Sequence, residues 1–205
     1  MSGKPLPAIL LTLAAARSSF LASCFFYTMS QPREPDLVKL IIRFLFSDYG
    51  TKLQALHALV SDFGPMDFLS TSAPFLYTTY YDKEMGQAIR RQTAGFLNLV
   101  APGSLPDIKL RTNEIEIRLS RNGKRQVNID PGLLSLERFV LATGKDFTHR
   151  VYLRDGIYAD LTFIYSKGAY SPLPWTYPDY REPQFLHYLE VLRKKLRFQR
   201  YGILP

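Results

Sequence analysis

Eight charged or polar side chains in the second half of the chain have the chemistry needed to hold a phosphorylated ligand. Lysine and arginine bind phosphate oxygens through charge-assisted hydrogen bonds, and amides and carboxylates accept hydrogen bonds from ligand hydroxyl groups. The candidates are Lys109, Asn113, Glu116, Asn128, Asp130, Lys145, His149 and Arg150. Among them, His149 is the candidate catalytic residue, because a histidine can act as a general acid or base.

Each candidate also has an ordinary structural role open to it. Asp130 can cap a helix, Glu116 can pair with Arg118 across two strands, and Lys145 can simply be solvated. The sequence leaves both alternatives open. Nucleophilic catalysis has less support, because there is no Gly-x-Ser-x-Gly motif and the single cysteine, Cys24, lies outside the expected core.

The cysteine and histidine content predicts no metal centre. One cysteine excludes an internal disulfide framework and any multi-cysteine metal site. The three histidines, His57, His149 and His187, show no metal-ligand spacing. The sequence identifies no cofactor.

The elements between residues 126 and 165 must position most of the candidates. Asp130-Pro131 predicts a helix start, because Asp is a good N-cap and Pro suits the first helical position, and Gly144 can end that helix. Alternation around Val151, followed by Asp155-Gly156, then predicts an antiparallel meander. We expect Lys109, Lys145 and His149 to approach one point where the ends of these elements meet.

Two structures fit residues 105–129. The alternating run Glu114–Leu119, followed by Asn122-Gly123, favours a hairpin after a short helix that ends near Asn113. The alternative is one continuous helix from Leu105 to Leu119. We favour the hairpin.

The first half of the chain predicts a strand, a helix, two strands, a short helix and a strand, in that order. The apolar run Val38–Phe46 suits a buried central strand, and Asp48 can cap a helix that Gly64 stops. Met66–Tyr81 is expected to form two extended pieces broken at Ala73-Pro74. Its aromatic residues either pack on the sheet or stack a nucleobase.

These elements predict an α+β fold. We expect a ferredoxin-like split βαβ module, extended by the antiparallel β-meander and followed by a C-terminal helix that begins at Pro183. The three prolines between Pro172 and Pro178 exclude regular structure there, so this stretch is expected to cross the body as an ordered strap.

The length of 205 residues suits a single domain, which we place at 29–192. Residues 1–28 resemble an export signal ending at a lipoprotein-type cleavage site before Cys24, although Arg17 interrupts the apolar run. The alternative, which we favour, is a translation start at Met29. It predicts a cytoplasmic protein, whereas the export signal predicts a lipoprotein anchored at Cys24. No apolar run is long enough to span a membrane.

The net charge of +8 is concentrated at the two ends of the chain. Residues 1–28 carry two excess positive charges and residues 193–205 carry five, which leaves the body nearly neutral. A basic body would have indicated nucleic-acid binding, whereas a basic tail at 193–205 indicates it much less. We favour a solvated helix end, which the helix dipole stabilises, as the explanation of this tail.

Several long sequence segments are typical of a known family. They are LPDIKLRTNEIE at 105–116, VNIDPG at 127–132, LATGKDFTHRVYLRDGIYA at 141–159 and PWTYPDYR at 174–181. Together they resemble an uncharacterised prokaryotic family catalogued as a domain of unknown function, number four-four-one-six. This family has no established activity, although some of its members carry the label of GTP-binding protein.

That label implies nucleotide binding, yet the P-loop motif is absent. A P-loop needs a glycine five positions before its Gly-Lys pair and a Ser or Thr after it, whereas Gly144-Lys145 has Phe139 and Asp146 at those places. We therefore expect a phosphorylated small ligand or nucleotide, GTP included, to bind by another design, with catalysis left open. The alternative is an RNA-associated binding module that uses the aromatic segment and the basic tail.

Overall fold

The computed structural model describes residues 30–203, and one compact unit that starts at Pro35 holds every strand and helix of that part. The predictions about Cys24 and about a start at Met29 lie outside the described residues. Within them, nine strands form one antiparallel sheet, accompanied by four α-helices. The predicted α+β fold with a C-terminal helix is confirmed. No helix in residues 30–203 has both the length and the apolar character needed to cross a membrane.

The elements have the following bounds. The strands are β1 (Val38–Phe46), β2 (Met66–Leu69), β3 (Ala73–Pro74), β4 (Arg90–Val100), β5 (Val127–Leu134), β6 (Arg138–Thr143), β7 (Arg150–Arg154), β8 (Ile157–Ser166) and β9 (Ala169–Pro172). The α-helices are α2 (Tyr49–Phe63), α3 (Asp82–Met85), α4 (Leu105–Arg118) and α5 (Pro183–Tyr201), and the 3-10 turns are η1 (Pro102–Ser104) and η2 (Pro178–Tyr180).

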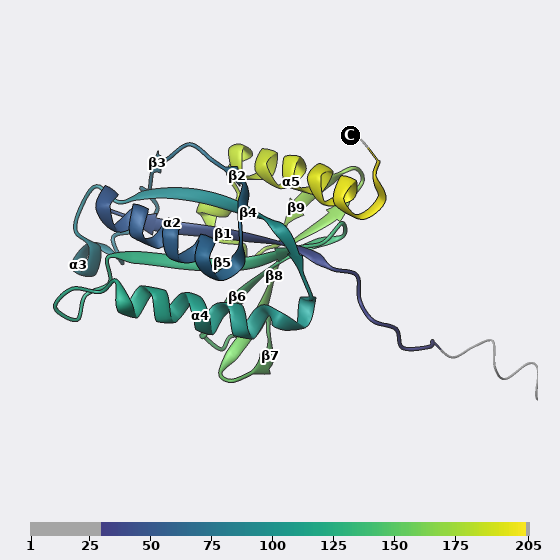
Figure 1. Ribbon diagram of the computed structural model, residues 1–205, viewed down its shortest axis with the longest axis horizontal. Coiled ribbons are helices and arrows are strands. Elements are labelled where there is room, and N and C mark those ends of the chain that lie inside the picture. Colours follow the sequence, from purple (N-terminus) through teal and green to yellow (C-terminus); the bar gives the residue numbers. More distant parts are fainter. Residues whose placement is uncertain (1–29, 204–205) are drawn as a thin grey trace, which may run out of the picture. The chain divides into compact units, whose positions relative to one another are not determined.

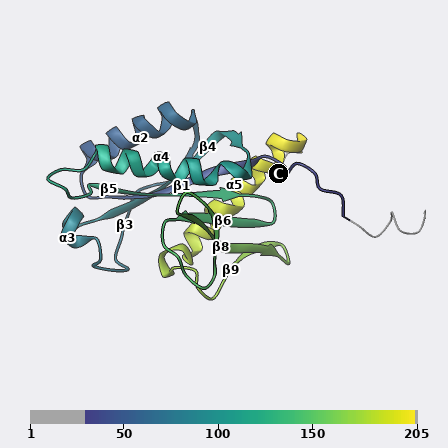
Figure 2. The same ribbon diagram turned by 90° about the horizontal axis from the view of Figure 1, so that it is seen from below.

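The sheet has the strand order β2-β4-β1-β5-β6-β8-β7, with β3 beside β4 and β9 beside β8. Strand β1 is buried along its whole length, as its continuous apolar run predicts. Helices α2 and α4 cover one face of the sheet, and α5 crosses the other (Figures 1 and 2). Because side chains alternate along a strand, β1 contributes to both faces.

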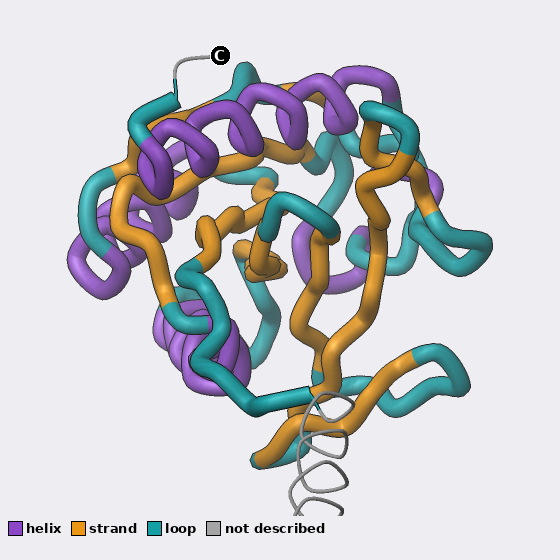
Figure 3. Tube along the Cα trace, turned by 90° about the vertical axis from the view of Figure 1, so that its right-hand side faces the viewer, coloured by secondary structure: helices purple, strands orange, loops and turns teal. Residues whose placement is uncertain are grey.

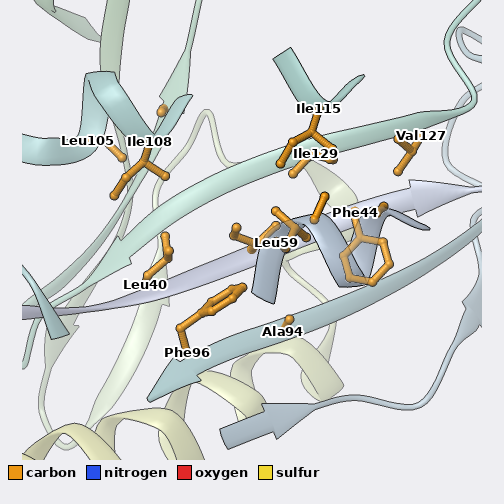
Figure 4. Packing of buried hydrophobic residues seen from close by; sticks show 14 of the residues in the cluster. Leu40, Phe44, Leu59, Ala94, Phe96, Leu105, Ile108, Ile115, Val127 and Ile129 are labelled. Carbon is orange, nitrogen blue, oxygen red and sulfur yellow. The ribbon is translucent and has the colours of Figure 1, made fainter. Parts of the chain in front are cut away.

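The first core lies between the sheet and helices α2 and α4 (Figure 4). Leu40 and Phe44 of β1 are fully buried there, against Leu59 of α2 and Ile115 of α4. Helix α2 begins where predicted, because the Asp48 carboxylate accepts a hydrogen bond from the Thr51 N–H.

The second core lies under α5, which runs over the strands as one continuous helix toward the C-terminus (Figure 3). Phe185, Leu189 and Leu192 of α5 are buried against the sheet. The helix approaches β4 so closely at Gly95 that a Cβ atom there would lie 2.7 Å from the Leu192 side chain. A glycine is therefore needed at this crossing.

A buried lysine fixes the C-terminal part of α5 to the sheet. The Lys39 side chain has no exposed surface and donates hydrogen bonds to Asp67 (2.8 Å), to the Phe96 carbonyl (2.8 Å) and to Gln199 of α5 (3.0 Å). Burial lowers the pKa of Lys39, although Asp67 raises it. Lys39 thus links β1 and β4 to α5, with its charge paired as a buried charge must be.

The predicted helix from Asp130-Pro131 to Gly144 is wrong, because this stretch forms the strands β5 and β6. Ile129 of β5 directs its N–H and C=O away from β1, toward side chains of α4. Pro131, two residues later, directs its backbone the same way. Strand β6 joins β5 only from Gly132 onward, so the missing N–H of Pro131 costs no ladder bond.

The favoured hairpin at residues 114–129 is also wrong, and the alternative of one long helix is confirmed by α4. Ile115 is buried on the helix, whereas Ile117 is 73% exposed, which a shared strand face would not allow. Asn122 and Gly123 do form a tight turn with positive φ angles, but it leads from α4 into β5.

The meander is confirmed: β7, β8 and β9 pair in succession, with Asp155-Gly156 and Lys167-Gly168 at positive φ in the two turns. The aromatic segment differs from the prediction. Ala73-Pro74 forms the short strand β3 rather than a break, and no strand follows between residue 75 and α3. Strand β4 begins at Arg90, well before the predicted strand at Phe96–Val100.

Candidate functional site

A cavity of about 640 Å³ opens where β5 and β6 diverge. The two strands pair only over Gly132–Leu134, so the first half of β5 has no strand partner on that side. The cavity is lined by parts of β1, α4, β5, β6, β7 and β8 and by two segments that carry aromatic residues, at 75–81 and 177–180. Its residues therefore come from segments far apart in the sequence.

Charged, amide and aromatic side chains dominate the lining. They are Arg43, Phe75, Tyr77, Tyr80, Tyr81, Lys109, Asn113, Glu116, Arg125, Asn128, Asp130, Lys145, Arg150, Asp160, Tyr177, Asp179 and Tyr180. A concave site of this size with several convergent polar groups is typical of small-molecule binding sites.

Seven of the eight candidate residues from the sequence line this one cavity. They are Lys109, Asn113, Glu116, Asn128, Asp130, Lys145 and Arg150. His149 does not line it and lies behind Asp160. Lys109 and Lys145 therefore line the same cavity, whereas His149 lies outside it. That they bind a ligand stays a prediction.

Two side chains of α4 hold the edge of β5 that lacks a strand partner. Lys109 Nζ donates to the Ile129 carbonyl (2.9 Å), and the Ile129 N–H donates to Glu116 Oε1 (2.5 Å). These are the backbone groups that a neighbouring strand would otherwise pair. Lys109 and Glu116 thus take the place of a strand, and β5 and β6 can stay apart around the cavity.

Glu116 is the acid of the site with the most altered proton affinity. Burial raises the pKa of Glu116 to about 7, and the nearby Asp130 carboxylate also raises it, while Lys109, Arg125 and the Ile129 N–H lower it. Only one of its oxygens accepts that N–H, and Oε2 lies 3.8 Å from Arg125 Nη1. Glu116 can therefore gain or lose a proton near neutral pH.

Asp130 has no helix to cap and instead joins a polar network on β5. Its Oδ1 lies 3.7 Å from Lys109 Nζ, and its Oδ2 accepts a hydrogen bond from Asn128 (2.7 Å). Arg125 donates to the Asn128 oxygen (3.0 Å), which orients the amide. The Asp130 side chain remains 36% exposed, so it can accept a hydrogen bond from a ligand.

Asp160 contacts both Arg150 and His149 at the β7 side of the cavity. Arg150 Nε donates to Asp160 Oδ2 (3.0 Å), and His149 Nε2 lies 3.2 Å from the same oxygen. The His149 ring stacks on Trp175, with ring centroids 4.9 Å apart and an interplanar angle of 14°. His149 is therefore fixed by its neighbours, and its role as an acid or base stays a prediction.

Lys145 stands alone among the cations of the lining. It lies in the exposed loop after β6, with Nζ 5.2 Å from the Tyr80 ring centroid. Among the described residues, no carboxylate lies within salt-bridge distance of Lys145. Its positive charge is thus free to meet an anion.

The sequence analysis missed Arg43, which lies on β1 and lines the cavity. Its Nη2 donates to the Asp179 carbonyl (3.0 Å), and its guanidinium lies 4.5 Å from the Tyr180 ring centroid. Burial raises the pKa of Asp179, although Arg43 lowers it. Arg43 and Lys39 are the two charged residues of β1, and a charge in a buried strand was the available signal, because a buried charge needs a partner. Arg43 ties the 173–181 strap to the sheet.

Comparison with known proteins identifies the family. The family model described as Domain of unknown function (DUF4416) matches residues 36–196, and the chain belongs to this family. The resemblance seen in the sequence is therefore confirmed. No curated protein and no solved structure matches the chain.

Proposed function

We propose that the cavity binds a phosphorylated small ligand of the nucleotide type, without a P-loop. The observation that carries this proposal is the convergence of Lys109, Lys145 and Arg150 on one cavity that also has aromatic walls. Cations bind phosphoryl oxygens, and the flat aromatic side chains offer stacking surfaces for a base. GTP belongs to this class of ligand.

Two aromatic segments support the base-binding half of the proposal. Tyr80 and Tyr81 lie edge to face on one side of the cavity, with ring centroids 5.0 Å apart, and both line it. Tyr177 and Tyr180 line it from the strap. Tyr80 and Tyr177 are 59% and 51% exposed, so their rings are accessible to a base, whereas Tyr81 packs against the cluster that contains Leu45 and Tyr180 is buried in the second core. The two exposed rings favour the stacking alternative over the sheet-surface one.

The α4 and β5 residues supply the polar groups for the rest of a nucleotide. Asp130 and Glu116 can accept hydrogen bonds from ribose hydroxyls or base amino groups, and Asn113 offers both a donor and an acceptor. In the described residues no hydrogen bond involves the Asn113 side chain. Its amide is therefore available to a ligand.

We also propose that the first half of the unit is a ferredoxin-like split βαβ module. The order β2-β4-β1-β5, the antiparallel pairing and the position of α2 and α4 on one face support it. The β-meander extends this module, and the cavity lies at the junction of the two halves.

The RNA-binding alternative receives less support. Arg193 donates to the Leu136 carbonyl, Lys195 to the Asp67 carbonyl and Arg200 to the Leu37 carbonyl. These cations are used to hold α5 in place, and only Lys194 and Arg197 among the five basic residues are exposed. Two exposed charges on a nearly neutral body are a weak footprint for nucleic acid.

Lys145→Ala tests the proposal, with Lys194→Ala as the control. Isothermal titration against guanine and adenine nucleotides is expected to show binding that Lys145→Ala weakens about tenfold or more, since a charge-assisted contact is lost. Lys194→Ala removes an equally exposed charge outside the cavity and should leave the affinity unchanged. Both variants should melt within about one degree of the unmodified protein.

The proposal would be overturned by a titration in which no nucleotide or sugar phosphate binds the unmodified protein at millimolar concentration. It would also fail if both lysine variants weakened binding equally, because the effect would then be one of overall charge.

A further inference from the structure

The charges that line the cavity nearly cancel, and this restricts which phosphorylated ligand it can take. Five cations line it, namely Arg43, Lys109, Arg125, Lys145 and Arg150, together with four carboxylates, namely Glu116, Asp130, Asp160 and Asp179. A site built for a polyphosphate would be expected to present a clear excess of positive charge.

Most of the positive charge in the lining is already paired with carboxylates. Arg43 lies 3.4 Å from Asp179 Oδ2, and Lys109 lies 3.7 Å from Asp130 Oδ1. These two cations thus have a carboxylate beside them before any ligand arrives.

The other two paired cations, Arg150 and Arg125, also lie beside a carboxylate. Arg150 Nε lies 3.0 Å from Asp160 Oδ2, and Arg125 Nε lies 2.5 Å from Glu84 Oε2. Lys145 is the single lining cation in the described residues without such a partner. One free cation remains for the anion.

We infer that the ligand carries one phosphoryl group, as a nucleoside monophosphate does, and that the cavity discriminates against the triphosphate of the same nucleoside. This inference rests on the proposed function and narrows it. A phosphate monoester carries a charge of about −1.5 to −2 at neutral pH. Two further phosphoryl groups would meet carboxylates whose cations are already paired, and like charges in a partly desolvated cavity repel strongly.

Proton uptake by Glu116 allows the net charge of the site to match that of a phosphate dianion. Its Oε2 is not engaged by a hydrogen bond in the described residues, and the charged groups that face it are Lys109, Arg125 and Asp130. Protonation neutralises the Glu116 carboxylate and thereby raises the net charge of the site by one, while Lys145 keeps its positive charge. The pKa of about 7 makes this proton uptake accessible at neutral pH.

Binding of monophosphates and triphosphates of one base tests the inference. Guanosine, GMP and GTP, and the three adenine counterparts, are titrated into the full-length protein with and without Mg²⁺. We expect one monophosphate to bind at least about tenfold more tightly than both its triphosphate and its nucleoside. Lys145→Ala should reduce the affinity for that monophosphate to near that of the nucleoside, and Lys145→Arg should retain it.

The outcomes separate this inference from the function on which it rests. If a triphosphate binds as tightly as its monophosphate, or more tightly, the inference is wrong while the nucleotide site stands. If the nucleoside binds as tightly as the monophosphate, the phosphoryl group is not recognised and the inference is wrong as well. If none of the compounds binds, both the proposed function and this inference are wrong.

Discussion

At the scale of single residues, Lys109 and Glu116 serve the backbone and the cavity at once. Both bond to Ile129, where a strand would otherwise pair, and both line the cavity. The structural and the ligand-binding interpretations of these residues are therefore compatible. A substitution that removes the backbone contact will alter stability and binding together, so only isosteric changes can separate the two roles.

The first prediction concerns the pH dependence of stability that arises from Glu116. Its pKa is raised from 4.5 to about 7 by folding, so the folded protein binds the proton more tightly. The resulting stabilisation is fully present below about pH 4.5 and is lost as the pH rises through about 7. Glu116→Gln keeps an oxygen for the Ile129 N–H but cannot ionise. It should therefore flatten this part of the stability profile, as measured by urea unfolding between pH 4.5 and 8.

The matched control for this prediction is Glu114→Gln, an exposed acid on the same helix. It should leave the pH profile as it is, because its side chain is exposed and does not line the cavity. A profile for Glu116→Gln that keeps the slope of the unmodified protein would show that Glu116 titrates at its ordinary pKa in the folded state.

At the scale of elements, the C-terminal part of α5 uses its basic residues for docking. Residues 193–201 continue the helix, and Arg193 also lies over the Tyr165 ring at 3.6 Å. From the sequence alone, the same segment is expected to be a solvated basic tail. The contacts of Arg193 and Lys195 predict otherwise.

The second prediction compares two double substitutions on α5. Arg193→Gln with Lys195→Gln should destabilise the protein by about 2 kcal/mol, since backbone carbonyls of Leu136 and Asp67 lose their donors. For a chain of this size that corresponds to a fall of roughly 4–8 °C in Tm. Lys194→Gln with Arg197→Gln removes the same charge from exposed positions and should leave Tm unchanged. Equal Tm values for the two double variants would refute the docking role.

Elements with strong local signals could be predicted from the sequence, and elements decided by tertiary contacts could not. Strand β1, the α2 cap at Asp48 and the β7–β8 turn depend on apolar runs, capping and turn chemistry. Strand β5 does not. Asp130-Pro131 has the local chemistry of a helix start, and only the absence of a partner strand beside Pro131 makes the strand possible.

Residues of the candidate site could be predicted where they are polar groups in short, unusual sequence motifs. Lys145 and Asp130 stood out because of their positions at turns and element ends. Arg43 and Asp160 did not, since each lies within a strand and its role depends on a partner on another element, Asp179 for Arg43 and Arg150 of the neighbouring strand β7 for Asp160. His149 fails as a lining residue for the same reason, because Asp160 and Trp175 hold it outside the cavity.

At the scale of the whole molecule, one sheet separates two hydrophobic cores. Leu59 of α2 is fully buried in the core on one face, and Leu192 of α5 is fully buried in the core on the other. Strand β1 contributes Leu40 to the first core and Ile41 to the second. Because successive residues of the same central strand belong to different cores, neither core can be lost while the other keeps its sheet.

The third prediction follows from this shared strand. Leu59→Ala and Leu192→Ala should each destabilise the protein by about 2–5 kcal/mol, because each leaves a cavity in a closely packed core. Both variants should still unfold in a single transition, with far-UV and near-UV circular dichroism changing together in urea. If Leu192→Ala instead showed two transitions, α5 and the second core would unfold before the sheet. In that case the Lys39 contacts with Asp67 and Gln199 would be too weak to couple α5 to β1.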